Sequence, residues 1–182
     1  RTTTRGVDGV GRLVSLTNPR GDRTRYAYDT LNRLAQLTDA QNGVTTFSYD
    51  PNGNLLSVAD AKNQSTTYTY DNMDRLATRT DALLRTETYG YDARGNLTAV
   101  TDRKGQATGL TYDALNRRIG AAYAGGATTT STYDAGNRLT QVVDSVSGTL
   151  TRSYDNLDRL TQETTAQGAV SYTYDAAGRR TP

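Results

Sequence analysis

The chain has 182 residues, a formal net charge of +2, and neither histidine nor cysteine. So small a charge gives no reason to expect nucleic acid or an anionic membrane as a partner, and no apolar run approaches the roughly 18 residues of a membrane span. Without His and Cys, the commonest general base, the usual zinc ligands and the thiol nucleophile are missing, so we expect no enzymatic activity, no metal and no cofactor.

The dipeptide Tyr-Asp recurs along the chain at a period of 21 residues, with a single step of 20 before the last copy. A fixed period of this size indicates a repeat architecture, in which each unit buries its apolar surface against its neighbours. We therefore expect one repeat array over residues 1–182 and no separate second domain. The copies are Tyr28-Asp29, Tyr49-Asp50, Tyr70-Asp71, Tyr91-Asp92, Tyr112-Asp113, Tyr133-Asp134, Tyr154-Asp155 and Tyr174-Asp175, with Val7-Asp8 as a degenerate copy upstream.

Each Tyr-Asp pair opens a predicted turn, here called the first turn of its repeat. Asp stands first and a Gly, Asn or Asp stands fourth, as in Asp50-Pro51-Asn52-Gly53. This is the chemistry of a type I turn, because the carboxylate accepts backbone N–H groups and the fourth residue tolerates a positive φ. We expect positive φ at Gly53 and Gly95.

A second turn of similar composition follows about ten residues later, as in Asn18–Gly21, Asp39–Asn42, Asp60–Asn63 and Asp102–Gly105. Between the turns lie short segments, one rich in Leu (33–38) and one rich in Thr and Tyr (45–49 and 66–70). Thr, Tyr and Val favour strands, short turns favour antiparallel hairpins, and no helical period is present. The pattern predicts an all-β, antiparallel β-meander with two strands per repeat.

Leu34 and Leu37 are three residues apart, so a regular strand would point them to opposite faces of the sheet. We expect a bulge at the turn that sets Tyr28 across from Leu34 and leaves Leu37 on the other face, so that both faces are partly apolar. About 17 strands would span roughly 80 Å. Because open sheets rarely exceed about ten strands without curling, we expect a curved, spiralling sheet with a concave side.

The unit from Tyr112 to Thr132 departs from the pattern: Arg118 replaces the first Leu, Tyr123 replaces the second-turn Asp, and Gly125-Gly126 follows. Either this repeat has drifted or the sheet bends there, and we favour drift.

Three sets of side chains are candidates for binding. The Asp residues are predicted to cap turns rather than hold calcium or act as catalytic carboxylates. The Tyr-x-Tyr pairs are predicted to pack as ladders between repeats, although aromatic faces also stack on sugars. Arg residues recur at one repeat position and are predicted to form a solvated or Asp-paired row along one sheet edge. The alternative is a weak glycan or polyanion site, with Arg33, Arg75 and Arg138 as its candidate contacts.

The unit Tyr-Asp-x-x-Gly-Asn/Arg-Leu-x-x-Val/Leu-Thr-Asp, with Tyr-x-Tyr before the next Asp, resembles the YD repeat of RHS (rearrangement hot spot) proteins. The resemblance extends from about Val7 to Arg179. The family includes bacterial polymorphic toxins, wall-associated proteins, insecticidal toxin-complex subunits and teneurins. The RHS core segment that ends the shell in this family, and the self-cleavage site that it precedes, have no counterpart here.

The resemblance implies a β-sheet strip that spirals into a hollow shell around a C-terminal toxin or effector. The partners it implies are flanking RHS repeats and that cargo, and the location it implies is secreted or on the bacterial cell surface. The alternative function is a carbohydrate-binding or adhesive repeat module of a surface protein. Under both functions, enclosure of a cargo and adhesion, we expect this segment to have no catalytic activity.

Overall fold

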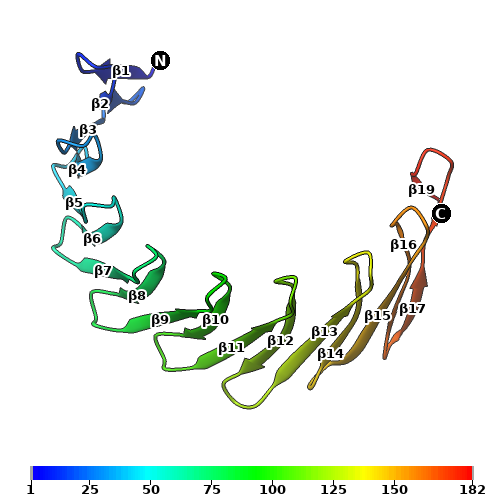
Figure 1. Ribbon diagram of the computed structural model, residues 1–182. Helices are drawn as coiled ribbons and strands as arrows, with labels where there is room; N and C mark the ends of the chain where they lie inside the picture. Colours follow the sequence, from blue (N-terminus) through cyan, green and yellow to red (C-terminus); the bar gives the residue numbers. More distant parts are fainter. Residues whose placement is uncertain (1, 182) are drawn as a thin grey trace. The chain divides into compact units, whose positions relative to one another are not determined.

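The computed structural model describes residues 2–181, which contain strands and turns and no helix (Figure 1). The predicted all-β meander is confirmed: each strand from β1 to β17 pairs antiparallel with the next one in sequence. The strands are β1 (Thr4–Val7), β2 (Leu13–Thr17), β3 (Arg23–Tyr28), β4 (Leu34–Thr38), β5 (Val44–Tyr49), β6 (Leu55–Ala59), β7 (Ser65–Tyr70), β8 (Leu76–Thr80), β9 (Thr86–Tyr91), β10 (Leu97–Thr101), β11 (Ala107–Tyr112), β12 (Arg118–Tyr123), β13 (Thr128–Tyr133), β14 (Leu139–Asp144), β15 (Gly148–Tyr154), β16 (Leu160–Thr165), β17 (Gly168–Ser171), β18 (Thr173–Tyr174) and β19 (Arg180–Thr181).

The chain divides into two compact units, the first ending at Thr88 and the second beginning at Tyr89. The first unit contains β1 to β8 and the start of β9. The second contains the remainder of β9 and the strands up to β17, followed by the separate β18–β19 pair. Both units are built from the same 21-residue hairpin repeat.

The turn residues have the predicted backbone conformation. Gly53 has a φ of 96° and Gly95 a φ of 89°, and the same left-handed region is occupied at the fourth position of the other first turns. In each first turn the N–H of the Asp donates to the carbonyl of the fifth residue, as from Asp29 to Arg33 at 2.9 Å. The second turns between residues 18 and 127 repeat this geometry. In one of them Leu84 has a φ of 59°, a left-handed conformation that is strained for any residue other than glycine.

The register corrects the expectation for the two leucines. Tyr28 faces Leu34 as predicted, but the pairing then shifts, so that Ala27 faces Gln36 and Tyr26 faces Leu37. Ala35 has no partner on β3, so it forms a second bulge in β4 in addition to the bulge at the turn. Because Tyr26 and Tyr28 lie on one face, the shift returns Leu37 to the face of Leu34. The same shift recurs beside Tyr49, Tyr70, Tyr112, Tyr133 and Tyr154.

The expectation that Leu37 makes the other face apolar is therefore wrong in these hairpins. One face carries large side chains, such as Phe47 opposite Val58, and the other carries mostly smaller ones, such as Ala59 and the pair of Ser48 with Ser57. The hydroxyls of that pair lie 2.6 Å apart, as do those of Thr69 and Thr78. Hydroxyl pairs satisfy one another across strands without making this face apolar.

A single layer of strands leaves little interior. Among the described residues only Ala121 and Ser15 are buried, and the accessible surface is 12105 Å². A compact protein of 19.7 kDa would expose about 8,600 Å². The stability of the array must therefore come from contacts between neighbouring strands rather than from a central core.

The drifted unit keeps the geometry of its neighbours. Tyr112 faces Arg118 across the usual register shift, and the turn from Tyr123 closes with Gly126 N–H donating to the Tyr123 carbonyl at 3.0 Å. Positive φ at Gly125 and Gly126 replaces the Asp-led chemistry of the other second turns. These contacts support drift.

Candidate functional site: the junction between repeats

Each first turn is closed by its Asp carboxylate. In Asp29, Oδ1 accepts the N–H groups of Leu31 and Arg33, both at 2.9 Å, and Oδ2 accepts the Arg33 Nε–H at 2.7 Å. The backbone N–H of Arg33 and then the Arg33 side chain hold the pKa of Asp29 below its usual 3.8, against an opposing effect of burial. The predicted capping role of Asp is thus what the contacts show for this residue. The pKa is lowered in the same direction at Asp8, Asp50, Asp71, Asp92, Asp113, Asp134, Asp155 and Asp175.

The same arginine reaches into the following repeat. The Arg33 guanidinium lies 4.7 Å from the centre of the Tyr49 ring, and its Nη1 donates to the main-chain carbonyl of Asp50 at 2.8 Å. A cation over an aromatic face is attracted by the ring quadrupole. The stacking recurs as Arg12 on Tyr28, Arg117 on Tyr133, Arg138 on Tyr154 and Arg159 on Tyr174.

The tyrosine of the following repeat bonds back to the preceding one. The Tyr49 hydroxyl donates to the main-chain carbonyl of Leu34 at 2.9 Å, next to Arg33 in sequence. Asp29, Arg33 and Tyr49 with these hydrogen bonds form what we call the junction clasp. The hydroxyl bond recurs at 2.8–3.1 Å from Tyr28, Tyr70, Tyr112, Tyr133, Tyr154 and Tyr174.

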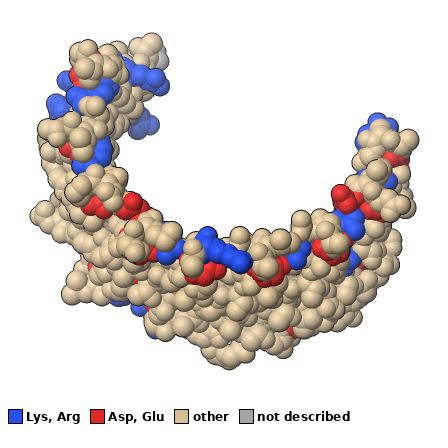
Figure 2. Space-filling model, viewed as in Figure 1, with Lys and Arg blue, Asp and Glu red and all other residues tan. Residues whose placement is uncertain are grey.

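The clasps place the predicted Arg row along the first-turn edge, where charged side chains of both signs follow one another (Figure 2). Arg33, Arg75 and Arg138, the candidate glycan contacts, pair with Asp29, Asp71 and Asp134 at 2.7–2.8 Å. Arg33 and Arg138 also stack on tyrosine. This geometry favours a structural role, since a glycan sulfate would have to compete with the paired carboxylates.

Sequence reasoning predicted the Asp-paired row but missed the stacking on tyrosine. The signal was present, because Arg33, Arg117 and Arg138 each stand five residues after one Tyr and 16 residues before the next. Cross-repeat contacts cannot be read from such a spacing until the register, bulge included, is known.

Two junctions carry asparagine in place of arginine. Asn54 Nδ2 donates to Asp50 Oδ2 at 2.9 Å and to Asp74 Oδ1 at 2.7 Å. Asn96 Nδ2 donates to Asp92 Oδ2 and to Asn116 Oδ1, both at 2.9 Å. Each amide bonds the Asp of its own turn and the fourth residue of the next turn, without the positive charge of arginine.

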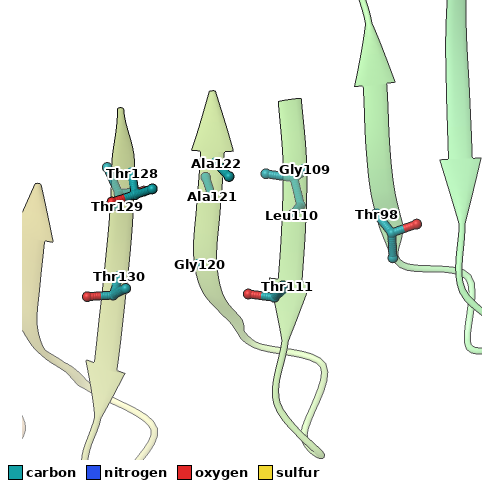
Figure 3. Close-up of a pocket in the computed structure, with 10 residues that line it drawn as sticks. All are labelled: Thr98, Gly109, Leu110, Thr111, Gly120, Ala121, Ala122, Thr128, Thr129 and Thr130. Atoms are coloured by element: carbon teal, nitrogen blue, oxygen red, sulfur yellow. The ribbon is translucent and has the colours of Figure 1, made fainter. Parts of the chain in front are cut away.

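A hollow of about 490 Å³ lies over β11 to β13 in the second unit (Figure 3). Its lining is made of Thr, Gly and Ala with one Leu, Leu110, and contains no ionisable side chain. Gly120 and Ala121 in this lining stand at the repeat positions of Gln36 and Leu37, so the drifted repeat has smaller side chains here. Such a lining offers packing and hydroxyl groups and no catalytic group.

Within residues 2–181, no cluster of acidic side chains has the geometry of a metal site. None of the described segments is a helix that could cross a membrane.

Comparison with known proteins gives a family and a fold. The RHS repeat family model matches residues 7–46, 49–86, 91–128, 133–170 and 154–181. No curated protein sequence matches the chain.

Among solved structures, a TcdB2-TccC3-Cdc42 structure has a TM-score of 0.72 at 17% identity, covering 98% of this chain and 12% of that one. A Photorhabdus luminescens Tc holotoxin pore with a TccC3 mutation has a TM-score of 0.67 at 18% identity, and the match covers 98% of this chain and 13% of that one. A TcdB2-TccC3 structure without the hypervariable C-terminal region has a TM-score of 0.62 at 17% identity, and the match covers 98% of this chain and 12% of that one. The chain thus spans about an eighth of these relatives and shares their fold over nearly all of its own length. With its repeats matched from residue 7 to residue 181, this chain belongs to the RHS repeat family.

Proposed function

We propose that this chain is a non-catalytic wall segment of an RHS shell that encloses a C-terminal toxin or effector of its parent protein. The observation that carries the proposal is the junction clasp, which recurs between neighbouring repeats along one edge. A wall needs continuity between its units more than it needs a core, and the clasp supplies that continuity. Membership of the family and likeness to Tc toxin chains support it.

The two faces of the sheet fit this role. The face with Phe47 and Val58 offers apolar side chains, and it remains only half-buried within the array itself. A half-exposed apolar face lowers its free energy by covering itself with other polypeptide. We propose that the enclosed segment, and flanking repeats, provide that cover. The secreted or cell-surface location follows from the same family role.

Limited proteolysis of the parent protein tests the proposal. The C-terminal segment should resist protease in the intact protein and become sensitive when clasps are broken, for example by Arg33→Glu combined with Arg138→Glu. A matched control carries Lys62→Glu and Lys104→Glu, which change charge on second turns. Rapid cleavage of the C-terminal segment within an otherwise intact wild-type shell would rule out enclosure.

Binding to a sulfated glycan tests the alternative function, an adhesive module. Heparin retention should disappear near physiological ionic strength, where charges are screened beyond about 8 Å. Retention at that salt that is lost in Arg33→Ala, Arg75→Ala and Arg138→Ala would favour an adhesive module instead.

A further inference from the structure

The Asn54 junction in the first unit brings two carboxylates together through neutral side chains. Asn54 bridges Asp50 and Asp74, and Asn52 Nδ2 donates to the same Asp74 Oδ1 at 2.9 Å. The Tyr70 hydroxyl donates to the Leu55 carbonyl at 3.1 Å, which is the bond that the other junction tyrosines make to the preceding repeat. Two carboxylates and the tyrosine bond of a clasp are therefore present at this junction, and an amide stands in the place of the cation.

The equivalent junction in the second unit shows what such a framework holds. Arg138 lies between Asp134 and Asp158, with contacts of 2.7 Å to both carboxylates. Its guanidinium is 5.0 Å from the Tyr154 ring centre and donates to the Asp155 carbonyl at 3.2 Å. Asp50, Asp74, Tyr70 and the Asp71 carbonyl occupy the corresponding repeat positions around Asn54.

We propose that the Asn54 junction binds the guanidinium group of an arginine side chain from another polypeptide segment. Two carboxylates and an aromatic face are the groups that recognise a planar guanidinium, and the sister repeats hold one at this position. This inference is independent of enclosure, because it concerns one junction of the exposed edge.

The electrostatics around Tyr70 agree with a missing cation. Burial, followed by the charges of Tyr68 and Asp50, raises the pKa of Tyr70 above its ordinary value of 10.0. A guanidinium beside the ring would oppose the contribution of Asp50.

The Asn96 junction in the second unit is an internal contrast. There the second acid is replaced by Asn116, and Arg94, from the same turn, already donates to the Ala114 carbonyl at 3.0 Å. A hollow of about 400 Å³ near this junction is lined by Asp92, Arg94, Tyr112 and Asp113 among others. With one carboxylate fewer and a cation nearby, this junction should bind an added guanidinium more weakly.

Titration of the 182-residue chain with N-acetyl-arginine methylamide, followed by NMR of the tyrosine rings, tests the proposal. We expect saturable shifts of the Tyr70 resonances, and shifts at Tyr112 that need at least about fivefold more ligand, the difference expected from about 1 kcal/mol of charge interaction. The lysine analogue and sodium chloride at equal ionic strength are the controls. Equal responses to the arginine and lysine analogues would overturn recognition of a guanidinium.

Two variants make the test reciprocal. Asn54→Arg places the ligand on the chain itself and should abolish the response at Tyr70. Arg138→Asn removes the built-in ligand and should create a saturable response at Tyr154, where wild type has none. Unchanged Tyr70 shifts in Asn54→Arg would contradict the proposal, even if Arg138→Asn did not fold.

Discussion

The two edges of the sheet are built from similar turns and are held in different ways. At the first-turn edge, clasps such as that of Arg33 with Tyr49 and Asp50 connect each repeat to the next. At the second-turn edge, the Asp39 carboxylate bonds only the N–H groups of Gln41 and Gly43, within its own turn. The first edge therefore joins repeats throughout, while the second mainly closes single hairpins, with the contact of Thr128 with Ser145 as an exception.

This difference indicates where a sheet without a core gains its cohesion. Strand pairing is common to both edges, so the extra stability between repeats should depend on the residues of the clasp. Substitutions on the first-turn edge should destabilise the array more than matched substitutions on the second.

Deletions should give the largest effect, because they can move residues from one edge to the other. Removing residues 28–48 joins Ala27 to Tyr49 and keeps every first turn on its edge, so a folded β-sheet should remain. Removing residues 39–48 joins Thr38 to Tyr49 and sends later first turns to the wrong edge. Circular dichroism and cooperative unfolding should be kept only in the 21-residue deletion. Equal behaviour of the two deletions would contradict the meander.

Tyr49→Ala should be the most damaging single change among those considered, lowering the free energy of unfolding by about 2–3 kcal/mol, somewhat less than for a fully buried aromatic residue. Tyr49→Phe, which loses only the bond to the Leu34 carbonyl, should cost about 1 kcal/mol. Gln41→Ala on the other edge should stay within about 0.5 kcal/mol. Chemical denaturation of the three variants compares the edges, and similar losses for Tyr49→Ala and Gln41→Ala would remove the distinction.

Backbone strain at the left-handed turn residues should have similar effects on stability at both edges, so it serves as a reference for the differences caused by the clasp. Gly95→Val should cost about 1–2 kcal/mol, because a branched residue is strained at a φ of 89°. Leu84→Gly, at a second-turn φ of 59°, should relieve strain and stabilise by about 0.5–1 kcal/mol. Thermal unfolding checks both signs, and a neutral Gly95→Val would show that the turn conformation is not required.

Acid should weaken the first-turn edge gradually. Because the folded chain lowers the pKa of Asp29 below 3.8, this group contributes stability at higher pH that is lost as pH falls through its folded pKa. The urea concentration at the midpoint of unfolding should therefore decrease as the pH is lowered below about 4. Asp29→Asn should reduce the slope of that fall. A midpoint that is constant from pH 6 down to pH 2 would show that the carboxylates do not contribute.

The sequence was sufficient to predict the repeat, the paired strands, the left-handed turn residues and the contact of Tyr28 with Leu34. It was insufficient for the second bulge, because Ala35 has no special conformational preference that marks it. The spacing of Leu34 and Leu37 was the available signal, since two leucines three apart share a face only if one residue is extra. The clasp depends on that register, and the stacking of Arg33 on Tyr49 could not be predicted without it.

The central claim is that the first-turn edge couples neighbouring repeats, and a double-mutant cycle between Arg33 and Tyr49 tests it most directly. Unfolding free energies of wild type, Arg33→Ala, Tyr49→Ala and the double variant should yield a coupling of about 0.5–1 kcal/mol, the strength of an exposed cation–π contact. A parallel cycle between Gln41 and Lys62, on neighbouring second turns, should yield none. Zero coupling between Arg33 and Tyr49, or equal coupling in both cycles, would contradict the account.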